Sequence, residues 1–139
     1  MTTSPGVEQL LVCVYYRVGR GDVAHAIARV RDIQRTLAGR FDGLRAQVLV
    51  RCEVRTGPGP GAPRDTGAAT AAPAAAADDT LMETYHLPLS AARAHSAPAA
   101  VIDTPEAALL LQALEDAARP LAPLLHGARH VEVFLPCAS

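Results

Sequence analysis

The fold is decided by LLVCVYYRVGRGDVAHAIARVRDIQRTLAGRFDGLRAQVLVRCEV, residues 10–54. Its first part, Leu10–Val18, is apolar at nearly every position, as expected of a central strand that is covered on both faces. Asp22–Ala38 carries apolar residues at helical spacing, and Gly39 is a suitable left-handed C-cap. Leu44–Val54 alternates apolar and polar residues, which predicts a second strand. This stretch therefore has the order strand, helix, strand.

The same order returns in the second half of the chain. We predict a strand at Leu81–Leu87, a helix at Thr104–Ala118 that starts with Thr-Pro-Glu, and a strand at His130–Leu135. A βαββαβ order is typical of an α+β, ferredoxin-like sandwich, in which a four-stranded antiparallel sheet of order 4-1-3-2 carries two helices on one face. We expect one such domain over residues 9–137, with the other sheet face free to meet water, a ligand or a second copy.

Two stretches of low complexity interrupt this pattern, at about residues 56–79 and 89–103. Both are rich in alanine and contain proline, and neither shows apolar periodicity. Such a composition cannot bury enough apolar surface to offset the entropy lost on ordering, so we predict mobile insertions.

Composition and charge exclude several classes of function. The 139 residues carry a net charge of -1, with 13 basic and 14 acidic side chains, so the basic excess of a nucleic-acid-binding protein is absent. Cys13, Cys52 and Cys137 are far apart and odd in number, which argues against a disulfide framework. We see no signal peptide and no apolar stretch of membrane-spanning length. We therefore expect a soluble, cytoplasmic protein with reduced thiols that binds neither nucleic acid nor membrane.

The alternation within each strand assigns side chains to two sheet faces. We place the apolar sets under the helices and a mixed set on the opposite face. The mixed set consists of Tyr15, Arg17, Arg45, Gln47, Arg51, Glu53, Glu83, Tyr85, His130 and Glu132, with Leu11, Cys13, Leu49 and Phe134 among them. Such a mixture suits an isologous dimer interface with a pocket better than it suits open water, so we predict a homodimer through this face.

Three short strings carry a resemblance to a known family. VYYRV, METY and RHVEVFLPC, in this order, resemble the bacterial domain-of-unknown-function family 4936 over about residues 10–43, 81–88 and 105–137. That family brings no activity to carry over. More distantly, the element order is similar to the dimeric α/β-barrel group, which includes monooxygenases of antibiotic-biosynthesis type, haem-degrading enzymes and small stress-response proteins. In that group two ferredoxin-like subunits pack sheet to sheet and enclose a cleft, so the resemblance implies a dimeric α/β barrel and no particular chemistry.

Six residues form the candidate ligand-binding cleft of the mixed face. They are Tyr15, Arg17, Glu83, Tyr85, His130 and Glu132. In a binding site, Arg17 would hold a carboxylate and His130 would act as a general base tuned by a neighbouring glutamate. In the alternative, which we favour, the six form a paired polar network that sets the register of the dimer.

The neighbours of these residues follow from the antiparallel order. We expect Arg17 to approach His130 and Glu132, and Arg51 or Glu53 to approach Glu83. His130 and Glu132 also offer two metal ligands on one strand, but this spacing is not diagnostic, and we predict no metal and no cofactor. A further histidine, His126, is isolated in the sequence, and we expect it to face solvent.

Two classes of function stay open. The first is a homodimer that binds a small, partly apolar molecule, which can be anionic, or that acts only as an interaction module. The alternative is a cofactor-free enzyme of monooxygenase-like or isomerase-like type that uses His130 and the tyrosines in the sheet-face cleft. No catalytic residue is assigned. A closed cavity beside an unpaired His130 would favour the enzyme.

Overall fold

The computed structural model describes residues 9–51, 77–89 and 104–136. Its elements are β1 (Gln9–Gly19), the 3-10 helix η1 (Arg20–Asp22), α1 (Val23–Arg40), β2 (Arg45–Val50), β3 (Asp78–Pro88), α5 (Pro105–Ala118), the 3-10 helix η3 (Arg119–Leu124) and β4 (His130–Phe134). The predicted βαββαβ order is confirmed. Cys52, Glu53, Cys137 and most of the two predicted insertions lie outside the described residues.

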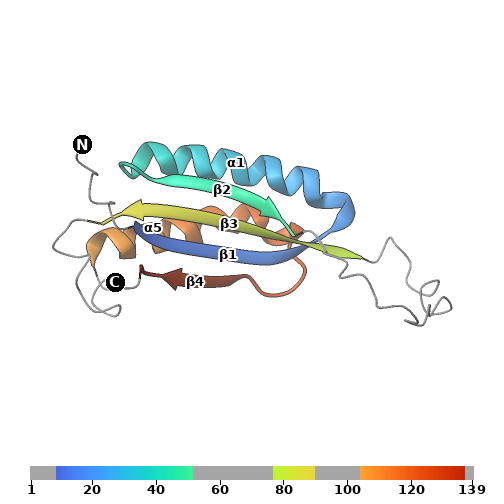
Figure 1. Ribbon diagram of the computed structural model, residues 1–139. Coiled ribbons are helices and arrows are strands. Elements are labelled where there is room, and N and C mark those ends of the chain that lie inside the picture. Colours follow the sequence, from blue (N-terminus) through green and yellow to red (C-terminus); the bar gives the residue numbers. More distant parts are fainter. Residues whose placement is uncertain (1–8, 52–76, 90–103, 137–139) are drawn as a thin grey trace, which may run out of the picture.

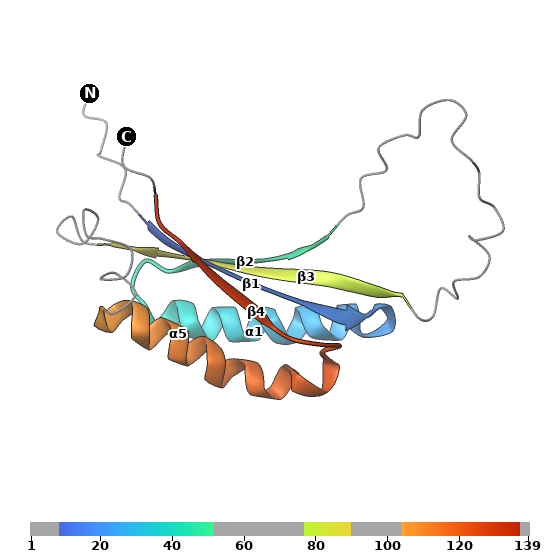
Figure 2. The same ribbon diagram turned by 90° about the horizontal axis from the view of Figure 1, so that it is seen from below.

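The four strands form one sheet in the order β2-β3-β1-β4, which is the predicted order counted from the other edge. Every neighbouring pair is antiparallel (Figure 1). Both helices lie against the same face of the sheet, so the described residues form two layers, one of helices and one of strands (Figure 2). No helix among the described ranges has the length and apolar character needed to cross a membrane.

The core lies between the two layers. Every second residue of β1, from Leu10 to Val18, is at most 2% exposed, as the sequence predicts for the face under the helices. The helices supply the opposing side chains Ala26, Val30, Leu37, Ala107, Leu110, Ala113 and Leu114. Burying each valine or leucine side chain stabilises the fold by roughly 1.5–3 kcal/mol. This gain favours a central position for β1, because five of its side chains are buried there.

The predicted faces of β3 are wrong. Glu83 lies opposite Val14 of β1, and Tyr85 lies opposite Val12. Residues directly opposite each other in an antiparallel pair share a face, so Glu83 and Tyr85 point towards the helices. Their exposed fractions are 2% and 0%. The physical reason is the strict period of two: Leu81 must be buried, and Glu83 has to follow it to the same face.

The end of α1 also differs from the prediction. The helix continues through Gly39 to Arg40, and the N–H of Phe41 donates to the carbonyl of Leu37 at 2.9 Å. The positive φ occurs later, at Gly43, with a value of 76°. Phe41 is partly buried against the core, so its packing favours two more helical residues, Gly39 and Arg40, before the chain reverses. The predicted start of the second helix is confirmed, with Thr104 at the N-cap and Pro105 in the first turn.

Candidate functional site

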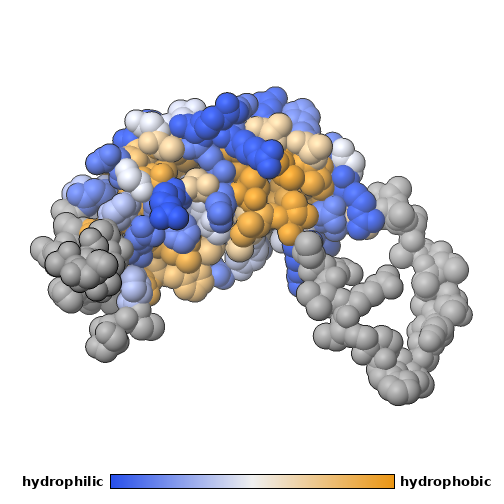
Figure 3. Space-filling view, turned by 45° about the horizontal axis from the view of Figure 1, so that its top comes forward, coloured by the Kyte–Doolittle hydropathy of each residue, from blue (hydrophilic) through white to orange (hydrophobic). Residues whose placement is uncertain are grey.

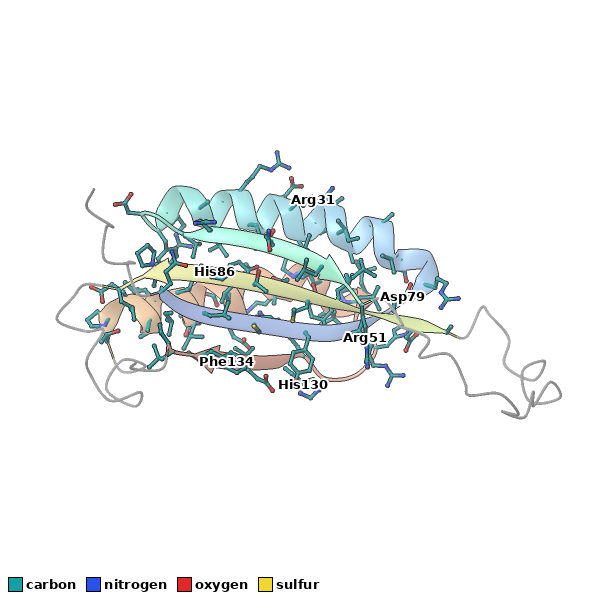
Figure 4. All side chains as sticks on the ribbon, in the orientation of Figure 1. Arg31, Arg51, Asp79, His86, His130 and Phe134 are labelled. Atoms are coloured by element: carbon teal, nitrogen blue, oxygen red, sulfur yellow. The ribbon has the colours of Figure 1, made fainter. Side chains whose placement is uncertain are left out.

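The sheet face turned away from the helices is called the open face here, and the strand register arranges its side chains in rows. Each row crosses the sheet from β4 through β1 and β3 to β2. The first row is Phe134, Leu11, His86 and Arg45, and the second is Glu132, Cys13, Thr84 and Gln47. The third is His130, Tyr15, Met82 and Leu49, and the last, without a residue of β4, is Arg17, Thr80 and Arg51. In an oblique view past β2, apolar surface gathers in a broad area bordered by hydrophilic side chains (Figure 3). His86, His130 and Phe134 mark the open face in Figure 4.

Three of the predicted site residues meet on the open face. The rings of Tyr15 and His130 stack with their centroids 5.0 Å apart. The hydroxyl of Tyr15 donates to Oε1 of Glu132 at 2.8 Å, and this bond raises the pKa of Tyr15. The Glu132 carboxylate is thus partnered by Tyr15, which agrees with a polar network more than with a glutamate that tunes His130 as a base.

The centre of the open face is shielded from water even in a single chain. Thr84 is 7% exposed, and its Oγ1 has no hydrogen-bond partner among the described residues. Cys13 lies beside it, and burial together with the nearby Glu132 raises the pKa of the thiol. The thiol is therefore protonated at neutral pH and is a poor nucleophile.

Arg17 does not approach His130 and Glu132, contrary to the prediction. The pairing of β1 with β4 ends at Tyr15, and Arg17 lies beyond it. Its Nε is 3.8 Å from Oδ2 of Asp78 instead. The predicted approach of Arg51 to Glu83 is also wrong, because Arg51 pairs with Thr80. The first error comes from placing strand ends from the sequence alone, where boundaries are least reliable. The second follows from the wrong face of β3, because Arg51 belongs to the open face and Glu83 points towards the helices.

Glu83 and Tyr85 are separated from the other four predicted residues by the sheet itself. The hydroxyls of Tyr16 and Tyr85 both donate to the carboxylate of Glu83, with 2.7 Å between Tyr16 Oη and Glu83 Oε2. Nearby, Nε2 of Gln34 donates to the carbonyl of Gln47 at 2.8 Å. Burial first, and then the Glu83 carboxylate, raise the pKa of both tyrosines well above the ordinary value. This buried cluster connects β1 with β3 inside the helix-covered layer.

A further polar group, which sequence reasoning did not bring together, lies where β1 and β2 end and β3 begins. We call it the polar end, and Arg51 and Asp79 mark it in Figure 4. It surrounds a hollow of about 570 Å³. The lining residues are Arg17, Arg20, Arg51, Asp78, Asp79 and Thr80.

Asp78 is the hub of the contacts at the polar end. Besides the contact with Arg17, its Oδ1 lies 2.9 Å from Nδ1 of His126. The backbone N–H of His126 donates to the carbonyl of Arg17 at 2.8 Å. A second ion pair joins Arg20 and Asp79, with 3.6 Å between Arg20 Nη2 and Asp79 Oδ1. His126 is half exposed, as predicted, but it is not isolated.

Two sequence signals could have revealed the polar end. RVGRGD, residues 17–22, spans the end of the first strand, and DDT, residues 78–80, opens the third. Because these two strands pair antiparallel, the two strings lie at the same end of the sheet. The predicted third strand starts at Leu81, and the predicted insertion before it includes Asp78 and Asp79. That assignment is wrong, because both aspartates belong to β3.

Neither the open face nor the polar end has a metal site among the described residues. Within residues 9–51, 77–89 and 104–136, no group of three histidine, cysteine, aspartate or glutamate side chains is arranged to hold a metal ion. His130 with Glu132 and His126 with Asp78 thus remain pairs in this part of the chain.

Comparisons with known proteins give the chain no family. The resemblance to family 4936 and to the dimeric α/β-barrel group stays a prediction, carried by three short strings and the element order. No protein-family model, no curated protein and no solved structure matches the chain.

Proposed function

We propose that the chain is a ferredoxin-like domain that forms a homodimer through its open face and holds a small, partly apolar molecule between the two sheets. One observation carries this proposal: among the described residues both helices lie on one side of the sheet (Figure 2), while the strand register places exposed apolar side chains on the other. Leu49 is 42% exposed and Phe134 is 47% exposed. Removing such surface from water is worth roughly 25 cal/mol per Å².

The distribution of polar groups favours a second copy as the partner. Glu132 lies on β4 and Arg45 lies on β2, at opposite edges of the sheet. In a face-to-face dimer whose two-fold axis runs along the strands, β4 of each copy lies over β2 of the other. The acidic edge of one copy then meets the basic edge of its partner, and Phe134 approaches the strand that carries Leu49. The face is self-complementary in this arrangement.

The ligand part of the proposal rests on the row that contains Tyr15 and His130. Their stacked rings offer an apolar surface with polar edges, and Arg17 lies one row further along β1. A planar, partly apolar molecule between the two sheets would pack on these rings. This is the kind of cleft that two facing sheets enclose when their central side chains are of unequal size.

No observation favours the enzyme alternative. His130 is exposed on the open face and packs on Tyr15, and a closed cavity beside it would have to be completed by the second copy. A cofactor-free monooxygenase or isomerase needs a base held next to an enclosed substrate, whereas His130 is exposed in the part of the chain that the structure describes. The interaction and binding roles are therefore the better supported conclusions.

Native mass spectrometry of the full chain, together with light scattering across protein concentrations, tests the proposal. We expect a dimer, and we expect Leu49→Asp and Phe134→Asp to shift it to monomer because each buries a charge in the interface. Leu109→Asp is the matched control, since Leu109 is 59% exposed on α5, on the helix side of the sheet. A wild-type monomer at all concentrations, or equal dissociation by Leu109→Asp, would reject the interface. A small molecule retained in stoichiometric amount would support the ligand.

A further inference from the structure

We propose that the polar end binds a small phosphate monoester through the guanidinium groups of Arg17, Arg20 and Arg51. All the lining residues come from one chain, so the hollow is complete without a partner. Arg17, Thr80 and Arg51 form the last row of the open face, one row beyond Tyr15 and His130, so the site adjoins the proposed dimer interface.

Three arginines reach one hollow because of the strand directions. Arg17 lies near the end of β1, Arg20 begins η1, and Arg51 directly follows β2. β1 and β2 each pair antiparallel with β3, so both end at the edge where β3 begins. The hollow of about 570 Å³ lies within the range of small-molecule pockets. Guanidinium groups that converge from separate elements suit a polydentate oxyanion such as a phosphoryl group.

The charge balance of the lining favours an anion. Three arginines face two aspartates, which leaves one excess positive charge at neutral pH, whereas the whole chain has a net charge of -1. Arg51 forms no ion pair within the described part of the chain. An unpaired guanidinium at the wall of a polar hollow is the group that a phosphate oxygen would bind first.

The two ion pairs between arginines and aspartates of the polar end have long contact distances. The nitrogen and oxygen atoms are 3.8 Å apart in the Arg17–Asp78 pair and 3.6 Å apart in the Arg20–Asp79 pair. Both distances exceed those of a charge-assisted hydrogen bond, so the guanidinium N–H groups remain available to a ligand. Thr80 adds a hydroxyl to the same lining.

His126 provides a reporter beside the site. Its ring is fixed by the contact with Asp78, and its Cε1 would lie 3.1 Å from a Cβ placed on Gly19. An anion that draws Arg17 away from Asp78 changes the electrostatic field at this ring, so the ring resonances of His126 should respond to binding.

Calorimetric and NMR titration of the full chain with glycerol phosphate and with inorganic phosphate, at low ionic strength, tests the proposal. We expect saturable binding that moves the His126 resonances, and glycerol phosphate at least as tight as inorganic phosphate because the hollow has room beyond one phosphoryl group. Arg51→Gln should weaken binding about tenfold, the usual effect of losing one hydrogen bond to a charged group. Arg31→Gln, on the exposed face of α1, should leave it unchanged.

A second variant separates a ligand site from a purely structural network. Asp79→Asn frees Arg20 from its ion pair, so it should tighten phosphate binding several-fold. A structural network would lose order instead, and weaker binding by this variant would overturn the proposal. So would equal binding by Arg51→Gln and Arg31→Gln, or the same response to chloride at matched ionic strength. The Leu49→Asp variant should still bind, and its failure to do so while folded would move the site into the dimer interface and overturn the single-chain claim.

Discussion

Glu83 places a carboxylate among the leucine, valine and alanine side chains of the core. Burying a carboxylate is costly unless hydrogen bonds replace the lost water. Here Tyr16 and Tyr85 supply those bonds from the same face of the sheet, and burial together with the Glu83 carboxylate raises the pKa of both hydroxyls. The three side chains therefore act as one unit whose stability depends on the protonation of the tyrosines.

We predict that the free energy of unfolding falls steeply above about pH 10. Tyrosine in the unfolded chain ionises near that value, while the raised pKa keeps Tyr16 and Tyr85 neutral in the folded protein. The unfolded state then binds fewer protons, so stability decreases with pH by up to about 1.4 kcal/mol per unit for each tyrosine. All 13 basic residues are arginine, so no lysine obscures the effect.

Urea unfolding at pH values from 8 to about 11 measures this dependence. Tyr16→Phe should make the slope shallower, and the double variant Tyr16→Phe/Tyr85→Phe should remove most of it. An unchanged slope in the double variant would show that other groups control the alkaline loss of stability.

The connection from α1 to β2 shows how an element boundary depends on contacts beyond the element. Gly43 has a φ of 76°, and a Cβ there would lie 2.8 Å from Cγ of Pro88, at the end of β3. Gly39 lies inside the helix, with nothing within 4 Å of an added Cβ. Position 43 therefore requires glycine, whereas position 39 has room for a side chain.

We predict opposite effects of alanine at these two positions. Gly43→Ala should destabilise the protein by about 1–2 kcal/mol, because it combines a strained φ with a clash against the Pro88 ring. Gly39→Ala should stabilise it by about 0.5–1 kcal/mol through helix propensity. Chemical unfolding of both variants measures the difference, and effects of the same sign would contradict the described end of α1.

The described part of the molecule has two layers, and the open face of the sheet is the surface that we propose a second copy covers. One face of the sheet is covered by α1 and α5 (Figures 1 and 2). The other carries the rows of mixed side chains that the strand register sets. In the dimer that we propose, burial of the open face would add to the stability of a chain with a core of this size. Folding and association are then thermodynamically linked.

We predict that the melting temperature rises with protein concentration. For a dimer of small domains the increase is about 3 °C for each tenfold in concentration. Differential scanning calorimetry across two decades of concentration measures it. Leu49→Asp should abolish the dependence while Leu109→Asp keeps it, and a concentration-independent wild type would argue against the dimer.

Sequence periodicity predicted most of the fold but only part of the candidate site. The faces of β1, β2 and β4 and the Thr104–Pro105 helix start are confirmed. The predicted face of β3 is wrong because the polar side chain of Glu83 follows Leu81 to the buried face. The polar end is not predicted because a third strand that starts at Leu81 leaves Asp78 and Asp79 in the preceding insertion, and because Asp78 and His126 lie 48 residues apart.

The sequence by itself determined the order of helices and strands and the buried face of the central strand, because spacing of apolar residues is a local property of a few turns or strand residues. Only the tertiary structure decided that Glu83 is buried beneath two tyrosines and that Arg17, Arg51, Asp78 and His126 gather at one end of the sheet. Those placements depend on strand register and on which strand ends coincide. Both are set by packing between distant parts of the chain, which no short stretch of sequence encodes.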